Sequence, residues 1–179
     1  MSPGLLLDKY GKFSFQTLKK WYGLLYIDPR QSLILDSESM WVNETVMGDL
    51  FDDYFAEPFL AYSDINIRRR AAALFLDVVK NHDFLFHTRN DKWFLEHFCW
   101  FYDRAILRDL FADHGSPLDM ADALYHSPTP DWALFETLFY HEYIYNHNDR
   151  YGYTVIDVDR ALAEALGPDR YLAYLDRFY

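Results

Sequence analysis

Apolar side chains recur every three or four positions from residue 43 onward, a spacing typical of helices that bury one face. The first such stripe runs from Val46 to Phe55 and stops before Pro58, with Asn43 as its expected N-cap. Ser63 is the expected cap of the following helix, which contains an alanine run at residues 71–73. The pattern therefore predicts a helical chain over residues 43–179.

The segment 90–113 is the most aromatic of these predicted helices. Asn90 is its expected cap, and Gly115 follows as a helix stop. Its apolar positions surround the whole helix axis, so a single buried face would leave many of them in water. We therefore expect residues 90–113 to form the central helix of the fold.

Prolines and glycines delimit the predicted helices of the second half. The pairs Ser116-Pro117 and Thr129-Pro130 each place a capping hydroxyl before a proline at the first helical position. These signals predict helices over 117–125 and 130–145, a loop over 146–152, and helices over 157–166 and 169–179, the last two divided by Gly167-Pro168.

The first 40 residues carry the only β signals. Residues 5–13 are expected to form a small hairpin or an extended arm, and a helix is expected after Ser14. The turn signal at residues 28–31 separates two short apolar runs, 24–27 and 33–35, that could pair as a hairpin. We expect β structure to be confined to this region.

Together these patterns predict a mainly α protein, a single compact domain over residues 1–179 with about seven helices around the helix at about 90–113. Residues 1–40 would contribute a hairpin and a helix. The chain is long enough for one well-buried core. It has a single cysteine, Cys99, no basic N-terminal leader and no apolar run of membrane-spanning length, which together favour the cytoplasm.

Charge is distributed unevenly along the chain. No Lys or Arg occurs between Arg30 and Arg68, or between Arg108 and Arg150, although each window carries eight carboxylates. The net charge of −11 argues against direct binding to nucleic acid, whose phosphates are recognised by clustered Lys and Arg. A basic protein partner fits this distribution better.

Two groups of carboxylates within these windows are the predicted partner-binding residues: Asp49, Asp52, Asp53 and Glu57, and then Asp109, Asp113, Asp119 and Asp122. Acids one helical turn apart can imitate a row of backbone phosphates. The plainer interpretation is a solvated face, partly neutralised in the first group by Arg68-Arg69-Arg70. That arginine run could instead bind an anion.

Signatures of catalysis are weak, and we expect no catalytic residue, no metal and no cofactor. His141-Glu142 and His147 have the letters of a zinc-protease motif but a spacing of six rather than four. His82-Asp83 is similar to the metal dyad of HD-type phosphohydrolases, but no histidine precedes it. The chain has neither a nucleophile elbow nor a glycine-rich phosphate loop.

The sequence thus favours a binding protein over an enzyme. We expect an acidic inhibitor or immunity-type factor, a nucleic-acid mimic that occupies the basic surface of a nuclease or another nucleic-acid-binding protein, as anti-defence proteins do. A tyrosine-rich C-terminal region, with a composition common at interfaces, agrees with this. The alternatives are a small metal-dependent hydrolase using His and Asp/Glu, and a self-associating structural or scaffold subunit.

Overall fold

A computed structural model describes residues 2–35, 44–65, 76–94, 100–127 and 134–178, and it confirms the mainly α class. The described residues form nine helices rather than about seven: α1 (Pro3–Ile27), α2 (Met47–Ala56), α4 (Leu76–Phe86), α5 (Arg104–His114), α6 (Pro117–Tyr125), α7 (Glu136–Asn146), α8 (Asn148–Tyr151), α9 (Val158–Leu166) and α10 (Pro168–Phe178). Five short strands accompany them: β1 (Gln31–Ile34), β2 (Phe59–Asp64), β3 (Lys92–Trp93), β4 (Trp100–Asp103) and β5 (Thr154–Asp157).

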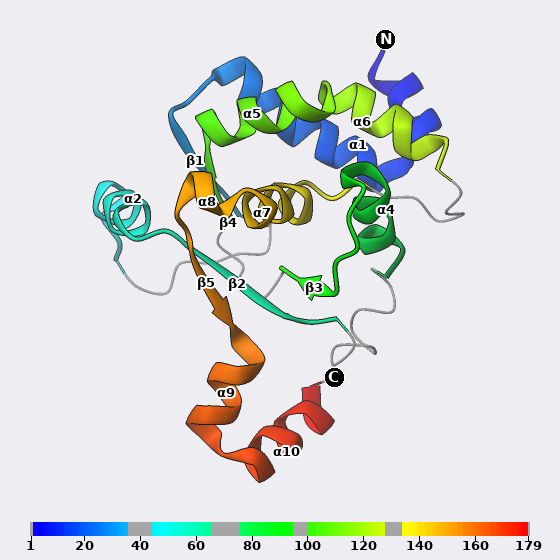
Figure 1. The fold of residues 1–179 in the computed structure, drawn as a ribbon. Helices are drawn as coiled ribbons and strands as arrows, with labels where there is room; N and C mark the ends of the chain where they lie inside the picture. The colour runs from blue at the N-terminus through cyan, green and yellow to red at the C-terminus, as the bar shows by residue number, and fades with distance from the viewer. Residues whose placement is uncertain (1, 36–43, 66–75, 95–99, 128–133, 179) are drawn as a thin grey trace.

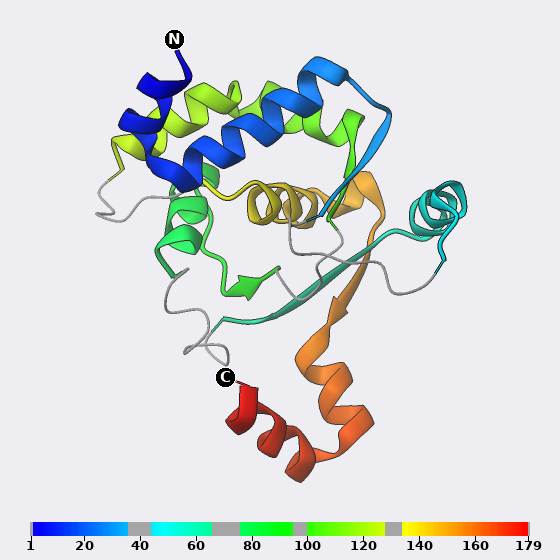
Figure 2. The same cartoon turned by 180° about the vertical axis from the view of Figure 1, so that it is seen from behind.

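Helix α7 lies at the centre of the molecule. All of its residues from Glu136 to Ile144 are buried, polar ones included. Helices α1, α5 and α6 cover one side of it, α4 lies beside it, and strands β2 and β3 lie on the other side (Figures 1 and 2). A helix enclosed on every side has no solvent-facing stripe, which is why its sequence lacks a clear amphipathic period.

The predicted central helix at 90–113 is wrong. Residues 92–93 form β3, residues 100–103 form β4, and helix α5 begins only at Arg104. Asp103 sets that start, because its carboxylate accepts a hydrogen bond from the Ala105 backbone N–H. Trp100, Phe101 and Tyr102 are buried on both faces of β4. So short an apolar run has no periodicity that distinguishes a strand from a helix. Asn90 does not cap a helix; its side-chain oxygen accepts from the Lys92 N–H.

The strands form two small sheets, so β structure is not confined to the first 40 residues. β1 pairs antiparallel with β4, whereas β2 lies between β3, its antiparallel neighbour, and β5, its parallel neighbour. The predicted strand near residues 33–35 is therefore present as β1, but its partner is β4, and residues 24–27 belong to α1. Ser63, the expected cap of the following helix, lies inside β2.

Helix α1 replaces the hairpin or arm expected over residues 5–13. It starts at the N-cap Ser2 and continues to Ile27, with one interruption at Gly11, whose φ of 74° and ψ of 171° are not helical. The polar stretch around Gly11 therefore marks a kink within a helix and not a turn between two strands. The helix expected after Ser14 is confirmed as the longer part of α1.

Replacing Gly11 by alanine is expected to lower the free energy of unfolding by about 1–3 kcal/mol, because this backbone region is almost exclusive to glycine. The matched control is Gly23→Ala in the same helix. A Cβ at Gly23 would meet no atom within 4 Å, so we expect a gain of about 0.4–1 kcal/mol. Urea unfolding of both variants measures the difference; equal effects of the same sign would contradict the kink.

Most helix boundaries of the second half are confirmed, but the helix predicted over 130–145 begins only at Glu136, because Leu134 and Phe135 are not helical. α6 has the predicted bounds, and Ser116 and Asp119 form a reciprocal capping box at its start. Asp157 caps α9, and Gly167 with Pro168 separates α9 from α10. The predicted loop at 146–152 contains the short helix α8. Asn43, residues 71–73, Cys99 and Thr129-Pro130 lie outside the described residues.

Candidate functional site

Helix α2 is held to the molecule by its aromatic face. The Tyr54 ring stacks on Phe101 with the centroids 4.0 Å apart, and Phe51 meets the same ring edge-on at 5.5 Å. Phe101 belongs to β4 and is buried. These contacts fix which side of α2 faces the core and therefore which side faces solvent.

The opposite side of α2 carries three of the predicted partner-binding carboxylates. Asp49, Asp52 and Asp53 are exposed, and Glu57 is exposed immediately after the helix. No ion pair or hydrogen bond joins these four carboxylates to another side chain in the part of the chain that the structure describes. Acids three or four positions apart on a helix repel each other by about 0.2–0.5 kcal/mol per pair. Arg68–Arg70, the counter-charge suggested by the sequence, lie outside the described residues.

The second predicted group has cations and hydroxyls that come from distant parts of the sequence. Asp109 forms an ion pair with Arg150 at 2.7 Å and accepts a hydrogen bond from the Tyr151 hydroxyl at 2.9 Å. Asp113 accepts a hydrogen bond from the buried Tyr143 at 2.6 Å. Both carboxylates of α5 therefore serve to attach α7 and α8.

The two carboxylates of α6 are engaged as well. The Asp119 carboxylate accepts from the backbone N–H and hydroxyl of Ser116, and these bonds lower the pKa of its carboxyl. Asp122 accepts from the Lys9 ammonium and the Tyr10 hydroxyl, both at 2.5 Å, and the Lys9 contact is the main cause of its lowered pKa. Lys9 belongs to α1, so the cation missing from the local sequence is supplied by tertiary packing.

The two predicted groups thus differ in their contacts. Those of α5 and α6 stabilise the fold, whereas those of α2 have no such contacts among the described residues. All eight carboxylates remain predicted partner-binding residues. Only the three on α2 and Glu57 have no evident role in stabilising the fold.

A buried polar cluster joins α4 to α7, and the sequence did not reveal it. The imidazole Nδ1 of His82 lies 3.0 Å from Glu142 Oε2, and both side chains are 2% exposed. The Thr88 hydroxyl donates to the other oxygen of Glu142 at 3.1 Å. Burial lowers the pKa of His82, against the raising effect of Glu142, so the imidazole is neutral and donates its Nδ1 proton to the carboxylate.

The His82 ring lies between aromatic neighbours. Its centroid is 3.7 Å from that of Phe139, and Phe86 lies edge-on to it. The remaining nitrogen, Nε2, is buried and has no hydrogen-bond partner among the described residues. An imidazole oriented by a carboxylate can act as a general base, but here the reactive nitrogen faces packed side chains rather than a substrate cleft. The cluster is therefore a structural tie between α4 and α7.

The two histidine patterns noted in the sequence make other contacts among the described residues. His147 Nδ1 contacts the Tyr143 carbonyl oxygen, and His141 Nδ1 contacts that of Phe94. The Asp83 carboxylate accepts from the Asn90 backbone N–H, and burial raises its pKa to about 6. Over the described ranges, no three His, Cys, Asp or Glu side chains are grouped so that they could hold a metal ion.

Three tyrosines of the C-terminal region lie inside the molecule. Tyr140, Tyr143 and Tyr153 are buried, and the Tyr140 hydroxyl accepts a hydrogen bond from the Asp103 backbone N–H. Burial and hydrogen bonding therefore account for much of the tyrosine content that the sequence suggested for an interface.

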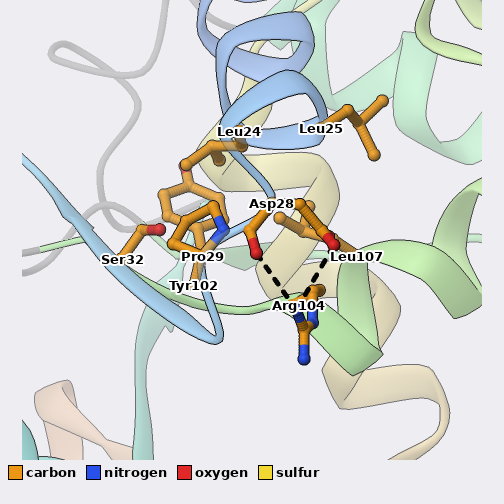
Figure 3. A pocket seen from close by; sticks show the side chains of 8 residues that line it. All are labelled: Leu24, Leu25, Asp28, Pro29, Ser32, Tyr102, Arg104 and Leu107. Atoms are coloured by element: carbon orange, nitrogen blue, oxygen red, sulfur yellow. Dashed lines mark hydrogen bonds and ion pairs between the residues drawn. The ribbon is translucent and has the colours of Figure 1, made fainter.

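A small pocket lies where α1 ends, lined mainly by apolar side chains from α1, β4 and α5 (Figure 3). Asp28 caps α1 in the left-handed conformation, with φ 51° and ψ 44°. Arg104 donates to the carbonyl oxygen and the carboxylate of Asp28, and Arg108 donates to the same carboxylate at 2.9 Å. Two guanidinium groups thus share the single Asp28 carboxylate at this pocket.

None of the described helices combines the length and the apolar character needed to cross a bilayer. Comparison of the chain with protein-family models, curated proteins and solved structures gives no match.

Proposed function

We propose that this protein is an acidic binding factor, of the inhibitor or immunity type, that uses the outer face of α2 to occupy a basic, nucleic-acid-handling surface of a partner protein. The observation that carries the proposal is that Asp49, Asp52, Asp53 and Glu57 are exposed and make no side-chain contact with a cation among the described residues. Their mutual repulsion would be relieved by Lys or Arg side chains of a partner.

The position of α2 supports docking. The helix lies at the side of the molecule, outside the group formed by α1, α5, α6 and α7 (Figures 1 and 2). Val46 and Met47, at its start, are 66% and 44% exposed. In an interface, exposed apolar side chains can exclude water, while neighbouring charged side chains determine which partner binds.

A basic nucleic-acid-binding surface is the partner chemistry that fits this face. Acids one turn apart can imitate a row of backbone phosphates, and the net charge of −11 steers any basic protein towards the molecule. We place the protein in the cytoplasm, where a single thiol such as Cys99 remains reduced.

The experiment is affinity capture from an extract of the native host, followed by displacement with duplex DNA. The wild-type protein is expected to retain a basic protein that DNA releases, because both ligands would compete for one surface. The double charge reversal Asp52→Lys/Asp53→Lys is expected to abolish retention.

The matched control is Asp8→Lys/Asp149→Lys, which changes the net charge equally at two exposed acids on α1 and α8. It should retain the partner. The proposal would be wrong if the two double variants captured the same proteins, or if DNA released none of them.

A further inference from the structure

The outer face of α1 carries cations that no described carboxylate neutralises. Two of the four lysines of this helix, Lys9 and Lys20, form ion pairs with carboxylates of α6 and α7. Lys12 and Lys19 are exposed, and the side chain of neither forms an ion pair or a hydrogen bond among the described residues. The Lys19 ammonium lies 5.1 Å from the centroid of the Phe15 ring, a contact that leaves its charge unneutralised.

The sequence around these lysines contains no counter-charge. No Asp or Glu occurs between Asp8 and Asp28. The Asp28 carboxylate is shared by Arg104 and Arg108, at 3.3 and 2.9 Å. Arg30, two residues further, is exposed, and its side chain forms no ion pair within the described ranges. The C-terminal end of α1 therefore has more cations than carboxylates around it.

The unpaired lysines belong to one stripe of the helix. Its residues follow each other at steps of four and three positions: Lys12, Gln16, Lys19, Gly23 and Tyr26. All but Gly23 are exposed, and a Cβ at Gly23 would meet no atom within 4 Å. The stripe is about 21 Å long. Figure 2 shows α1 in front of α5 and α6, with no described element in front of it.

The width of this stripe decides which anionic partner fits it. At about 0.15 M salt, charges act over about 8 Å, which is less than the width of one helix. A narrow acidic segment along α1 would therefore meet the lysines and little else. A bilayer extends further and would also meet exposed carboxylates such as Asp8, in a chain with 28 acids against 17 basic residues.

The spacing of the cations favours a protein over a nucleic acid. Lys12 and Lys19 are seven residues apart, which is about 10.5 Å along the helix, whereas phosphates are bound by clustered Lys and Arg. Two helices that lie alongside each other meet through positions four and three apart, so their contacts repeat every seven residues. Acids at that interval on a partner helix would face both lysines.

We propose that this stripe of α1 is a docking site for an acidic helix of another protein, which lies alongside α1. Carboxylates of that helix pair with Lys12 and Lys19, and Arg30 extends the basic surface at one end. Tyr26, 92% exposed, supplies apolar area that the contact buries. The site goes beyond the proposed function, because it is basic and shares no residue with the acidic face of α2.

Fluorescence anisotropy of a dye-labelled alanine-based helical peptide of about 21 residues, with glutamate at every third or fourth position, tests the site in about 0.15 M salt. The full chain is expected to bind this peptide and not its counterpart with glutamine in place of glutamate. Lys12→Glu/Lys19→Glu should raise the dissociation constant by about tenfold or more, because two attractive contacts become repulsive. Lys12→Gln/Lys19→Gln should raise it by less.

The matched control is Arg89→Glu/Arg170→Glu, which changes the net charge equally at two exposed cations outside α1. It should bind the peptide like the wild type. Asp52→Asn/Asp53→Asn should not weaken binding either, which separates this site from the α2 face. Circular dichroism should show all variants folded.

Three results would overturn the proposal. The first is a wild type that does not bind the glutamate peptide, and the second is equal weakening by the lysine and arginine reversals. The third is preferential binding of phosphatidylglycerol vesicles or of a single-stranded oligonucleotide through Lys12 and Lys19, because the stripe would then belong to lipid or nucleic acid.

Discussion

Replacing His82 by leucine is expected to lower the free energy of unfolding by about 1.5–3 kcal/mol, the range for a hydrogen bond to a charged group. The substitution removes the Nδ1 donor that lies 3.0 Å from Glu142, and it leaves that carboxylate, 2% exposed, with the Thr88 hydroxyl as its remaining donor among the described contacts. A buried carboxylate that loses one of its hydrogen-bond donors is less well compensated for its desolvation. Urea unfolding measures the loss.

The double variant His82→Leu/Glu142→Met provides the control, because it removes both members of the pair. Its loss should fall short of the sum of the two single losses by about 2 kcal/mol. Additive losses would mean that His82 and Glu142 stabilise the fold independently, contrary to the paired geometry.

The pH dependence of this loss has a definite sign. Burial lowers the pKa of His82 in the folded protein below the ordinary value of 6.5. Below pH 6.5 the imidazole is therefore protonated in the unfolded chain but still neutral in the folded one. The free energy of unfolding of the wild type therefore decreases as the pH falls below 6.5. His82→Leu has no imidazole at this position and does not show this decrease. The difference between wild type and His82→Leu should be smaller at acidic pH than at neutral pH.

Truncation of Trp21 to alanine is the second large effect, with an expected loss of about 3–5 kcal/mol. Trp21 is fully buried, and its indole ring meets Phe111 of α5 at 5.2 Å and Phe139 of α7 at 6.2 Å. Removing it leaves a cavity where three helices meet. Thermal and urea unfolding would both show the loss.

The adjacent residue gives a matched control, because Tyr22 is an aromatic side chain of the same helix that is 41% exposed. Tyr22→Ala should change stability by no more than about 0.5 kcal/mol. Trp21→Phe should also be mild, since the indole N–H is buried without a hydrogen-bond partner and the phenyl ring keeps most of the contact. Equal losses for Trp21→Ala and Tyr22→Ala would contradict the burial of this face of α1.

The sequence predicted the helices whose ends have chemical markers. Pro117 and the Ser116 cap define α6, and Asp157 with Gly167 defines α9, because these signals act within a few residues. The strands and the central helix depend on partners far along the chain. β1 pairs with β4, and α7 is central because other elements surround it, and neither relation has a local signature.

In the candidate site, too, local features could be predicted from the sequence and contacts between distant residues could not. The α2 acids could be found from their spacing and the absence of neighbouring cations in the sequence. The partners of Asp109 and Asp122 could not, because Arg150 and Lys9 reach them only through tertiary packing. The contact between His82 and Glu142 likewise required the packing of α4 on α7.

The most direct test of the α2 surface is the dissociation constant of the captured partner, measured by calorimetric titration at about 0.05 M and about 0.3 M salt. Asp52→Lys/Asp53→Lys should raise the dissociation constant by about 10–100-fold at low salt and should make it depend less on salt. Asp8→Lys/Asp149→Lys should change the dissociation constant far less. Equal dissociation constants for these two variants, or an affinity that salt does not change, would contradict the assignment of α2 as the partner-binding face.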